Sequence, residues 1–328
     1  MPKTTLSTTL IKASGIERYY GNFHAVKNLD FELNKGDILG FLGPNGAGKS
    51  TTMQIISGCL APDAGQIQIN GVDLTDEPTQ AKQQLGYLPE LPPLYKELTV
   101  DEYLSYTARL RKIPKTEITQ SLEKAKIRCG LSTVGNKLIS NLSKGYQQRV
   151  GIAQAIIHNP AVIILDEPTV GLDPIQIQEI RQLIIELGKD HGVILSTHIL
   201  PEVQAVCNRV QIMRQGELVY HSDMQTLTDS MHSQQTELCF SKGINVSLLN
   251  EAEKFWKFKK ITETNYLVEL SNSETDEEEA IQLLLKSIID NKLPLISMNP
   301  KTQSLEQIFI DLTANEVRPE KQIQGADA

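Results

Sequence analysis

Short aliphatic runs alternate with helix-like segments in the first two-thirds of the chain. The run at residues 37–43 leads directly into a glycine-rich turn, and a helix-compatible segment follows at residues 50–57. The runs at 162–165 and 193–195 are apolar at successive positions, which is typical of strands buried on both faces of a parallel sheet. Residues 67–69, flanked by glycines, are typical of a small hairpin strand. This alternation predicts an α/β domain.

Helical patterns fill the stretch between residues 98 and 158. Thr99 followed by Glu102 has the spacing of a capping box, and the apolar residues that come next begin a helical face. A further helix is expected at Pro174, because the first turn of a helix tolerates proline. The apolar positions expected on its buried face are Ile177, Ile180, Ile184 and Leu187.

The pattern changes after residue 224. Residues 236–240 and 266–270 are predicted strands, and the acidic run at 276–279 is predicted to open a helix that continues to residue 289, since acidic residues suit the start of a helix. We interpret this region as a small α+β appendage. The predicted division of the chain is residues 1–13 as a flexible N-terminal tail, 14–228 as the main domain, 229–313 as the α+β domain and 314–328 as a polar tail.

Composition narrows the possible roles. The 328 residues include 32 Lys+Arg and 40 Asp+Glu, a net charge of −8, so nucleic acid is not an expected partner. The four cysteines are scattered, which favours a reducing cytosol over a disulfide framework or a zinc site. The N-terminus lacks the apolar core of a signal peptide, and the aliphatic run around 161–165 is far shorter than the roughly 20 residues of a membrane helix. We therefore expect a soluble chain that reaches a membrane only through a partner.

A glycine-rich loop between the first predicted strand and helix carries the strongest chemical signal. Residues 43–50 fit the pattern GxxxxGK[ST], in which backbone N–H groups and a helix N-terminus surround a phosphate. Lys49 is expected to neutralise the β- and γ-phosphates of a nucleotide, and Ser50 to offer its hydroxyl to Mg²⁺. The alternative is a turn that fits the pattern by chance. The predicted nucleotide contacts are Gly43, Pro44, Asn45, Gly46, Ala47, Gly48, Lys49, Ser50 and Thr51.

Two adjacent acids end the aliphatic run at 162–165. Unpaired buried carboxylates are costly, so Asp166 and Glu167 at this position indicate a cation to serve. Asp166 is placed to hold Mg²⁺, and Glu167 to polarise the water that attacks the γ-phosphate. Alone, the pair could equally be a strand end that meets solvent, but together with the phosphate loop the catalytic interpretation is favoured.

Over about residues 16–224 the chain resembles the ATP-binding subunits of ATP-binding cassette (ABC) transporters. The resemblance rests on the two motifs above and on residues 142–149, LSKGYQQR, which are similar to the family's LSGGQ signature. It implies a P-loop NTPase cassette: a RecA-like parallel-sheet core with an antiparallel β subdomain and a helical subdomain at about 91–158. In the family the signature completes the ATP site of a second subunit, so a head-to-tail dimer is implied, with Ser143 and Gly145 at the phosphate. By itself, Ser143 could simply cap a helix.

Three further positions fit the family. His198 is expected to contact the γ-phosphate as the switch histidine, and Asp173 to belong to the D-loop that couples the two ATP sites. Tyr20 fits the aromatic residue on which adenine stacks, although its neighbour Tyr19 is an alternative.

Two departures from the family pattern also bear on function. Glu90 stands where the family has the Q-loop glutamine, and keeps an oxygen ligand while adding negative charge, so we expect activity to survive with altered metal or pH dependence. Lys144 and Tyr146 replace two signature residues; Lys144 either adds positive charge near the partner's phosphate or points to solvent. Glu90 together with this signature is similar to ATPases of exporters for drugs, polysaccharides or gliding-motility machinery.

The sequence thus predicts an ATPase subunit that powers a separate polytopic membrane permease, with ATP and Mg²⁺ as cofactors and a second copy of itself as partner. It would lie at the cytoplasmic face of the membrane through the permease, whose coupling helix the family receives near residues 89–95 and 135–141. The alternatives are a soluble mechanical ATPase acting on DNA or the ribosome, and an inactive nucleotide-binding module. The predicted catalytic residues are Glu167, His198 and Lys49, and the predicted metal ligands are Ser50, Asp166 and Glu90.

Overall fold

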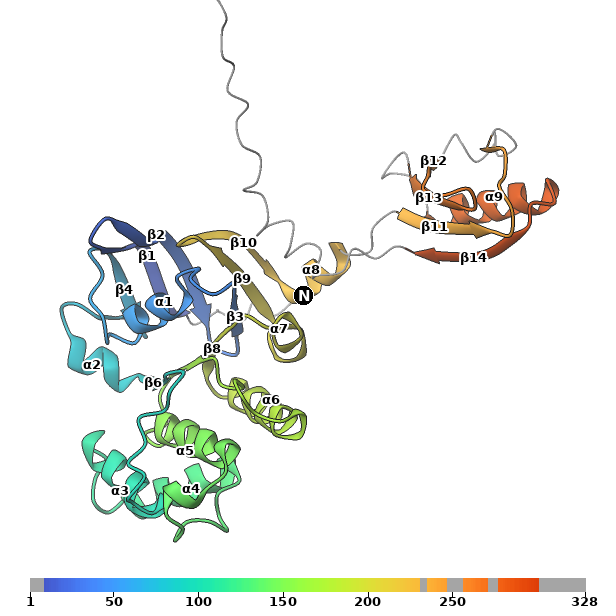
Figure 1. Ribbon diagram of the computed structural model, residues 1–328. Coiled ribbons are helices and arrows are strands. Elements are labelled where there is room, and N and C mark those ends of the chain that lie inside the picture. The colour runs from blue at the N-terminus through green and yellow to red at the C-terminus, as the bar shows by residue number, and fades with distance from the viewer. Residues whose placement is uncertain (1–8, 231–234, 247–255, 271–276, 301–328) are drawn as a thin grey trace, which may run out of the picture. The chain divides into compact units, whose positions relative to one another are not determined.

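The computed structural model describes residues 9–230, 235–246, 256–270 and 277–300 (Figure 1). The chain divides into two compact units, with the boundary between Met224 and Gln225. Each unit has its own hydrophobic core. We describe them separately, as the N-terminal and C-terminal units.

A six-stranded sheet forms the centre of the N-terminal unit, in the order β10-β9-β3-β8-β7-β6. All of its neighbouring strands are parallel except β10, which pairs antiparallel with β9. Every residue of β3, β7 and β8 is buried, as the continuous aliphatic runs predict. The strands are β3 (Ile38–Leu42), β6 (Leu85–Leu88), β7 (Val162–Asp166), β8 (Gly192–Thr197), β9 (Arg209–Arg214) and β10 (Glu217–Asp223).

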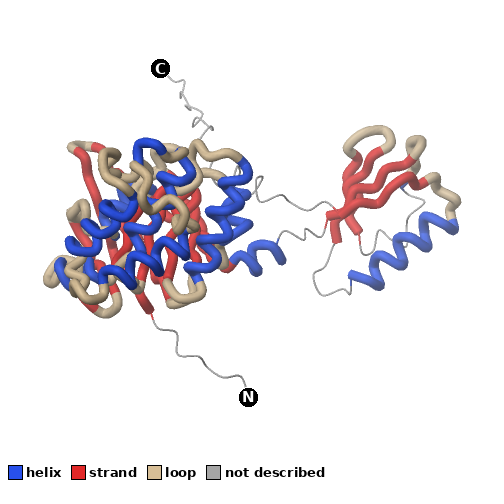
Figure 2. Tube along the Cα trace, turned by 90° about the horizontal axis from the view of Figure 1, so that it is seen from below, coloured by secondary structure: helices blue, strands red, loops and turns tan. Residues whose placement is uncertain are grey.

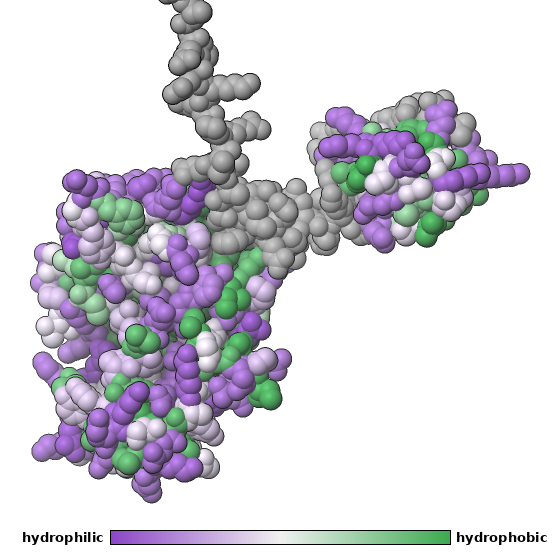
Figure 3. Space-filling view, viewed as in Figure 1, coloured by the Kyte–Doolittle hydropathy of each residue, from purple (hydrophilic) through white to green (hydrophobic). Residues whose placement is uncertain are grey.

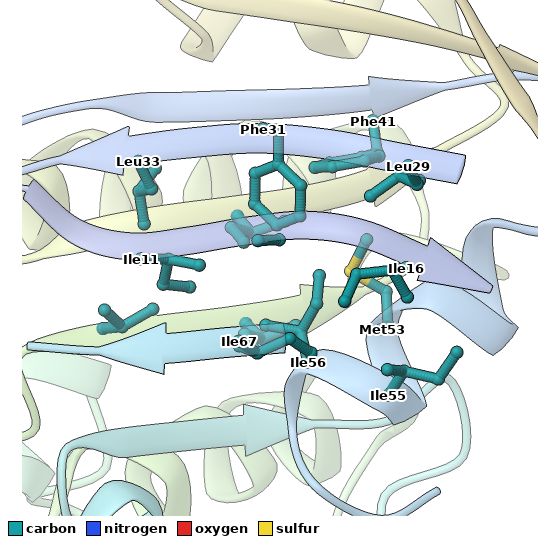
Figure 4. Packing of buried hydrophobic residues seen from close by; sticks show 14 of the residues in the cluster. Ile11, Ile16, Leu29, Phe31, Leu33, Phe41, Met53, Ile55, Ile56 and Ile67 are labelled. Carbon is teal, nitrogen blue, oxygen red and sulfur yellow. The ribbon is translucent and has the colours of Figure 1, made fainter. Parts of the chain in front are cut away.

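A second, antiparallel sheet has the order β2-β1-β4-β5 and packs on the first through a shared core. The T-shaped pair of Phe31 from β2 and Phe41 from β3, whose ring centroids lie 5.2 Å apart, belongs to this core (Figure 4). Strand β1 begins at Thr9, so residues 9–13 are paired strand and not part of a flexible tail, which corrects the sequence-based assignment. The strands are β1 (Thr9–Tyr20), β2 (Phe23–Asn34), β4 (Ala64–Ile69) and β5 (Val72–Asp73).

Three helices, α3 to α5, form a separate lobe of the N-terminal unit (Figure 1), which we call the helical lobe. The predicted capping box is confirmed at its first helix, where Glu102 N donates to the Thr99 hydroxyl at 3.2 Å and Thr99 N donates to the Glu102 carboxylate at 2.8 Å. The helices of the unit are α1 (Lys49–Ile56), α2 (Pro78–Gln83), α3 (Val100–Leu110), α4 (Ile118–Cys129), η1 (Ile139–Asn141, a 3₁₀ turn), α5 (Lys144–Ile156), α6 (Pro174–Gly188) and α7 (Leu200–Val206).

The C-terminal unit is an α+β structure in which α9 covers a four-stranded antiparallel sheet of order β12-β13-β11-β14 (Figure 2). Its core includes Trp256, whose indole N–H donates to the Ala280 carbonyl at 3.1 Å. Both predicted strands and the predicted helix are present. The elements are α8 (Met224–Ser230), which begins at the boundary, β11 (Gln235–Phe240), β12 (Trp256–Lys260), β13 (Asn265–Leu270), α9 (Glu277–Asp290) and β14 (Leu295–Pro300).

Within the described residues, no helix combines the length and the apolar character that crossing a lipid bilayer requires. On the face shown in Figure 3, hydrophobic residues lie in small patches among hydrophilic ones.

Candidate nucleotide-binding site

The phosphate loop, residues 43–48, connects the buried strand β3 to helix α1. Gly48 has φ +101°, and a Cβ there would lie 2.6 Å from the Ala25 carbonyl oxygen; a Cβ at Gly43 would lie 2.5 Å from the Met213 carbonyl oxygen. Only glycine fits such positions, so the loop is held close against β2 and β9. No side chain caps the N-terminus of α1, which leaves its first N–H groups for another acceptor.

Lys49 extends from the start of α1 into the interior beside this loop. Its side chain is 6% exposed, and Nζ donates to the carbonyls of Gly43 at 2.7 Å and Pro44 at 3.2 Å. Nζ also lies 3.9 Å from Glu167 Oε1. Burial lowers the pKa of Lys49, and the negative charges of Glu167, Asp166 and Glu90 oppose that shift. The pKa of Lys49 is lowered overall, and these carboxylates favour the charged ammonium against the effect of burial.

Asp166 and Glu167 stand at the carboxyl end of β7, and both are buried. Burial raises the pKa of Asp166, the nearby hydroxyls of Ser196 and Ser50 lower it, and the charge of Glu90 raises it further. Glu167 has a backbone φ of +49°, an unfavourable conformation for glutamate, and its N–H donates to the Ser196 carbonyl at 2.9 Å. Strain of this kind persists only where the surrounding structure holds the residue in place.

His198 follows the neighbouring strand β8 and reaches the same point. Its Nδ1 lies 3.0 Å from both carboxylate oxygens of Glu167. Burial raises the pKa of Glu167, and the hydrogen bond and charge of His198 work against that shift. The carboxyl ends of two adjacent parallel strands thus bring a histidine, a carboxylate and the lysine of the phosphate loop together.

Comparison with known proteins gives the family of the chain. The family model described as ABC transporter matches residues 26–170. A linearmycin resistance ATP-binding protein from Bacillus subtilis is 30% identical over 310 residues, which cover 94% of this chain and the whole of that protein. The chain belongs to the ABC transporter ATP-binding proteins. A bacitracin transport ATP-binding protein from Bacillus licheniformis is 39% identical over 215 residues, 65% of this chain and 69% of that protein.

Solved structures confirm the predicted cassette fold and the ATPase activity. An ATP-binding subunit of an ABC transporter is 31% identical, with a TM-score of 0.62 over 68% of this chain and 93% of that one. An ATP-binding cassette solved as a dimer after hydrolysis, bound to ADP and phosphate, is 25% identical, with a TM-score of 0.59 over 66% of this chain and 99% of that one. This protein is thus an ABC ATPase.

The remaining predicted residues of the ABC ATPase lie on other elements. Ser143 caps α5 of the helical lobe, accepting from Tyr146 N at 3.4 Å, and Gly145 packs closely on Gln176 of α6. Asp173 caps α6, accepting from Gln176 N at 2.9 Å. The end of Lys144 lies against Gly171, where a Cβ would be 2.0 Å from Nζ, so this exposed side chain rests on the neighbouring loop and does not simply extend into solvent.

The two candidate aromatic residues of the ABC ATPase differ in their neighbours. Tyr19 stacks on His24, with ring centroids 3.9 Å apart. Tyr20 is 46% exposed and faces the Arg18 guanidinium at 5.2 Å from the ring centroid. Tyr19 is 42% exposed, so the two rings are about equally open, and each has one face covered.

A magnesium ion fits the acidic end of β7. Among the described residues no group of three His, Cys, Asp or Glu side chains is arranged to hold a metal without other ligands. However, Asp166 Oδ1 is buried without a hydrogen-bond partner, next to the hydroxyl of Ser50. Mg²⁺ in phosphate sites binds few protein oxygens and completes its coordination shell with phosphates and water. The carboxylate of Asp166 and the hydroxyl of Ser50 are protein oxygens of this kind.

One buried acid near the site, Glu202, is not among the functional residues that the sequence predicts. Glu202 of α7 is 2% exposed and accepts hydrogen bonds from the hydroxyls of Thr169 and Thr197. A glutamate in the first turn of a helix is ordinary, so the sequence carried no signal for it.

Proposed function

We propose that this ATPase powers a separate membrane permease and that the transporter is an exporter. The observation that carries the proposal is the end-to-end similarity to a linearmycin resistance ATP-binding protein, which includes the C-terminal unit. The similarity to a bacitracin transport protein supports the same class of cargo. The chain would then work at the cytoplasmic face of the membrane, held there by the permease.

Hydrolysis follows from the charges around the γ-phosphate position. Burial lowers the pKa of Lys49, the charges of Glu167, Asp166 and Glu90 oppose that shift, and the ammonium neutralises phosphate oxygens. Glu167 accepts a proton from the attacking water, a role suited to a carboxylate whose pKa burial has raised. His198 holds the carboxylate in place through its 3.0 Å contact. Ser50, Asp166 and Glu90 would hold Mg²⁺, which would supply further charge neutralisation.

A second copy of the chain completes each site in this proposal. Ser143 and the N-terminus of α5 would face the phosphates of the partner's nucleotide, and Asp173 would lie across the dimer interface. The dimeric form of a related cassette supports this arrangement. ATP would therefore join two chains, and hydrolysis would release them.

The permease would dock beside the segment that follows Glu90. Leu91 is 84% exposed and Tyr95 is 52% exposed, so this segment offers apolar surface that a protein partner could cover. Tyr95 meets the rings of Tyr103 and Tyr106 edge-on. A groove of about 560 Å³ adjoins Tyr106 and could receive one turn of a coupling helix.

Two experiments test these assignments. Tagged chain is recovered from detergent-solubilised membranes, and we expect a stoichiometric polytopic membrane protein with it; ribosomes, DNA-bound proteins or no partner would instead favour the mechanical ATPase. Glu167→Gln is expected to abolish turnover and to accumulate an ATP-bound dimer, measured by phosphate release and size-exclusion chromatography. Glu186→Gln, an exposed carboxylate of α6, is the matched control. Wild-type turnover in Glu167→Gln would show that another group activates the water.

A further inference from the structure

Glu202 is a buried carboxylate whose hydrogen-bond donors are neutral. It stands in α7, four residues after His198, and is 2% exposed. One oxygen accepts from the Thr169 hydroxyl, and the other accepts from the Thr197 hydroxyl at 2.7 Å. Both threonines are buried as well, at 4% and 0% exposure. Burying a carboxylate without a cation costs stability, so we expect Glu202 to have a role other than stabilising the fold.

The two threonines lie next to the catalytic pair, Thr169 in the turn after Glu167 and Thr197 at the end of β8. Thr169 lies two residues after Glu167, in a turn where Val170 N donates to the Glu167 carbonyl at 3.3 Å. Thr197 directly precedes His198, and its hydroxyl also accepts from Ile199 N at 3.1 Å. A single carboxylate therefore joins the ends of β7 and β8 just beyond the point where Glu167 and His198 meet.

We propose that Glu202 is a positioning residue that fixes the contact between Glu167 and His198. Glu167 sits in a strained backbone conformation, which needs support from its surroundings, and the Thr169 bond anchors the turn that follows it. The Thr197 bond anchors the residue next to His198. Each of the two threonine hydroxyls needs a hydrogen-bond acceptor. A carboxylate provides two acceptors, whereas an apolar side chain provides none. The inference rests on the proposed roles of Glu167 and His198.

The main test compares Glu202→Leu and Glu202→Gln in the full-length chain. Glu202→Leu removes both acceptors, and we expect the kcat of ATP hydrolysis to fall about tenfold with KM for ATP unchanged, because Lys49 and its loop are untouched. Glu202→Gln keeps an acceptor for one threonine and a donor for the other, so a loss below about threefold is expected. Thr169→Val and Thr197→Val each remove one of the two hydrogen bonds to Glu202. Their losses in kcat should lie between those of Glu202→Leu and Glu202→Gln. Thr107→Val, a buried threonine of α3, is the control for that substitution.

A double-mutant cycle separates positioning from a merely structural role. If Glu202 acts through His198, Glu202→Leu should lower kcat less than about twofold in a His198→Ala background. Equal losses in both backgrounds, or no loss in either, would overturn the proposal. A lower thermal midpoint together with equal losses would assign Glu202 to folding alone.

A second measurement, of the NMR signals of the His198 ring, tests the same proposal without ATP hydrolysis. The ring ¹⁵N signals of His198, one of six histidines, are assigned by their loss in His198→Ala, and we expect them to shift in Glu202→Leu at constant pH. An unchanged signal would overturn the proposal. If the wild-type chain does not hydrolyse ATP, the proposed function of Glu167 and His198 fails, while the ring signals still decide whether Glu202 positions His198.

Discussion

Replacing Leu284 with alanine should destabilise the C-terminal unit strongly. Leu284 lies on α9, is 0% exposed and belongs to the core of that unit. The change removes about three methylene equivalents, or ~2.4 kcal/mol of transfer free energy at ~0.8 kcal/mol each. The cavity left behind raises the expected loss in the free energy of unfolding to about 3 kcal/mol. A unit of this size has only about 5–10 kcal/mol of stability, so the loss is a large share of the total.

Urea unfolding followed by tryptophan fluorescence measures this loss directly. The chain has one tryptophan, Trp256, which is buried in the same core and so reports on the C-terminal unit alone. With an m-value of about 1.2 kcal/mol/M, the midpoint of Leu284→Ala should fall by ~2.5 M. Ile289→Ala is the control, because Ile289 is 70% exposed on the same helix and should cost less than about 0.5 kcal/mol. Equal shifts in both variants would refute this account of the core.

Two other substitutions test the electrostatics of the site and the capping of the helical lobe. Burial is the first cause of the raised pKa of Asp166 and of the lowered pKa of Lys49, and the charge of Glu90 moves both values upward. Glu90→Gln should therefore move the acid and alkaline limbs of the pH–rate profile of ATP hydrolysis to lower pH, and an unchanged profile would contradict this. Thr99→Ala removes the cap of α3 and should cost about 1 kcal/mol in thermal unfolding; no measurable loss would mean that the capping box is not formed in solution.

The parts of the site that depend on local sequence were predictable. The phosphate loop needs glycine for its backbone path, as Gly48 shows, and this requirement is visible in the residues themselves. The acids at the end of β7 could be read because a strand buried on both faces rarely ends in carboxylates without use for them.

The parts that depend on distant contacts were not predictable. Residues 9–13 join β1 through pairing with β2 and β4, whose residues lie far along the chain. Strand β1 also has register shifts, as between Ala13 and Ile16, that break the alternation by which a strand is recognised. Glu202 meets Thr169 across 33 positions, and Lys144 rests on a loop that no spacing links to it. Such contacts form only when the chain is folded.

Strand β12 is an edge strand of the small C-terminal sheet, and its side chains affect how the protein associates in solution. Lys257, Lys259 and Lys260 are exposed along this edge strand. Among the described residues no strand pairs with the outer side of β12, so its backbone groups could accept a strand from another molecule, and repulsion between lysines opposes that pairing. Because salt screens the repulsion, we expect concentrated solutions to stay clear at low ionic strength and to associate through this edge as salt rises.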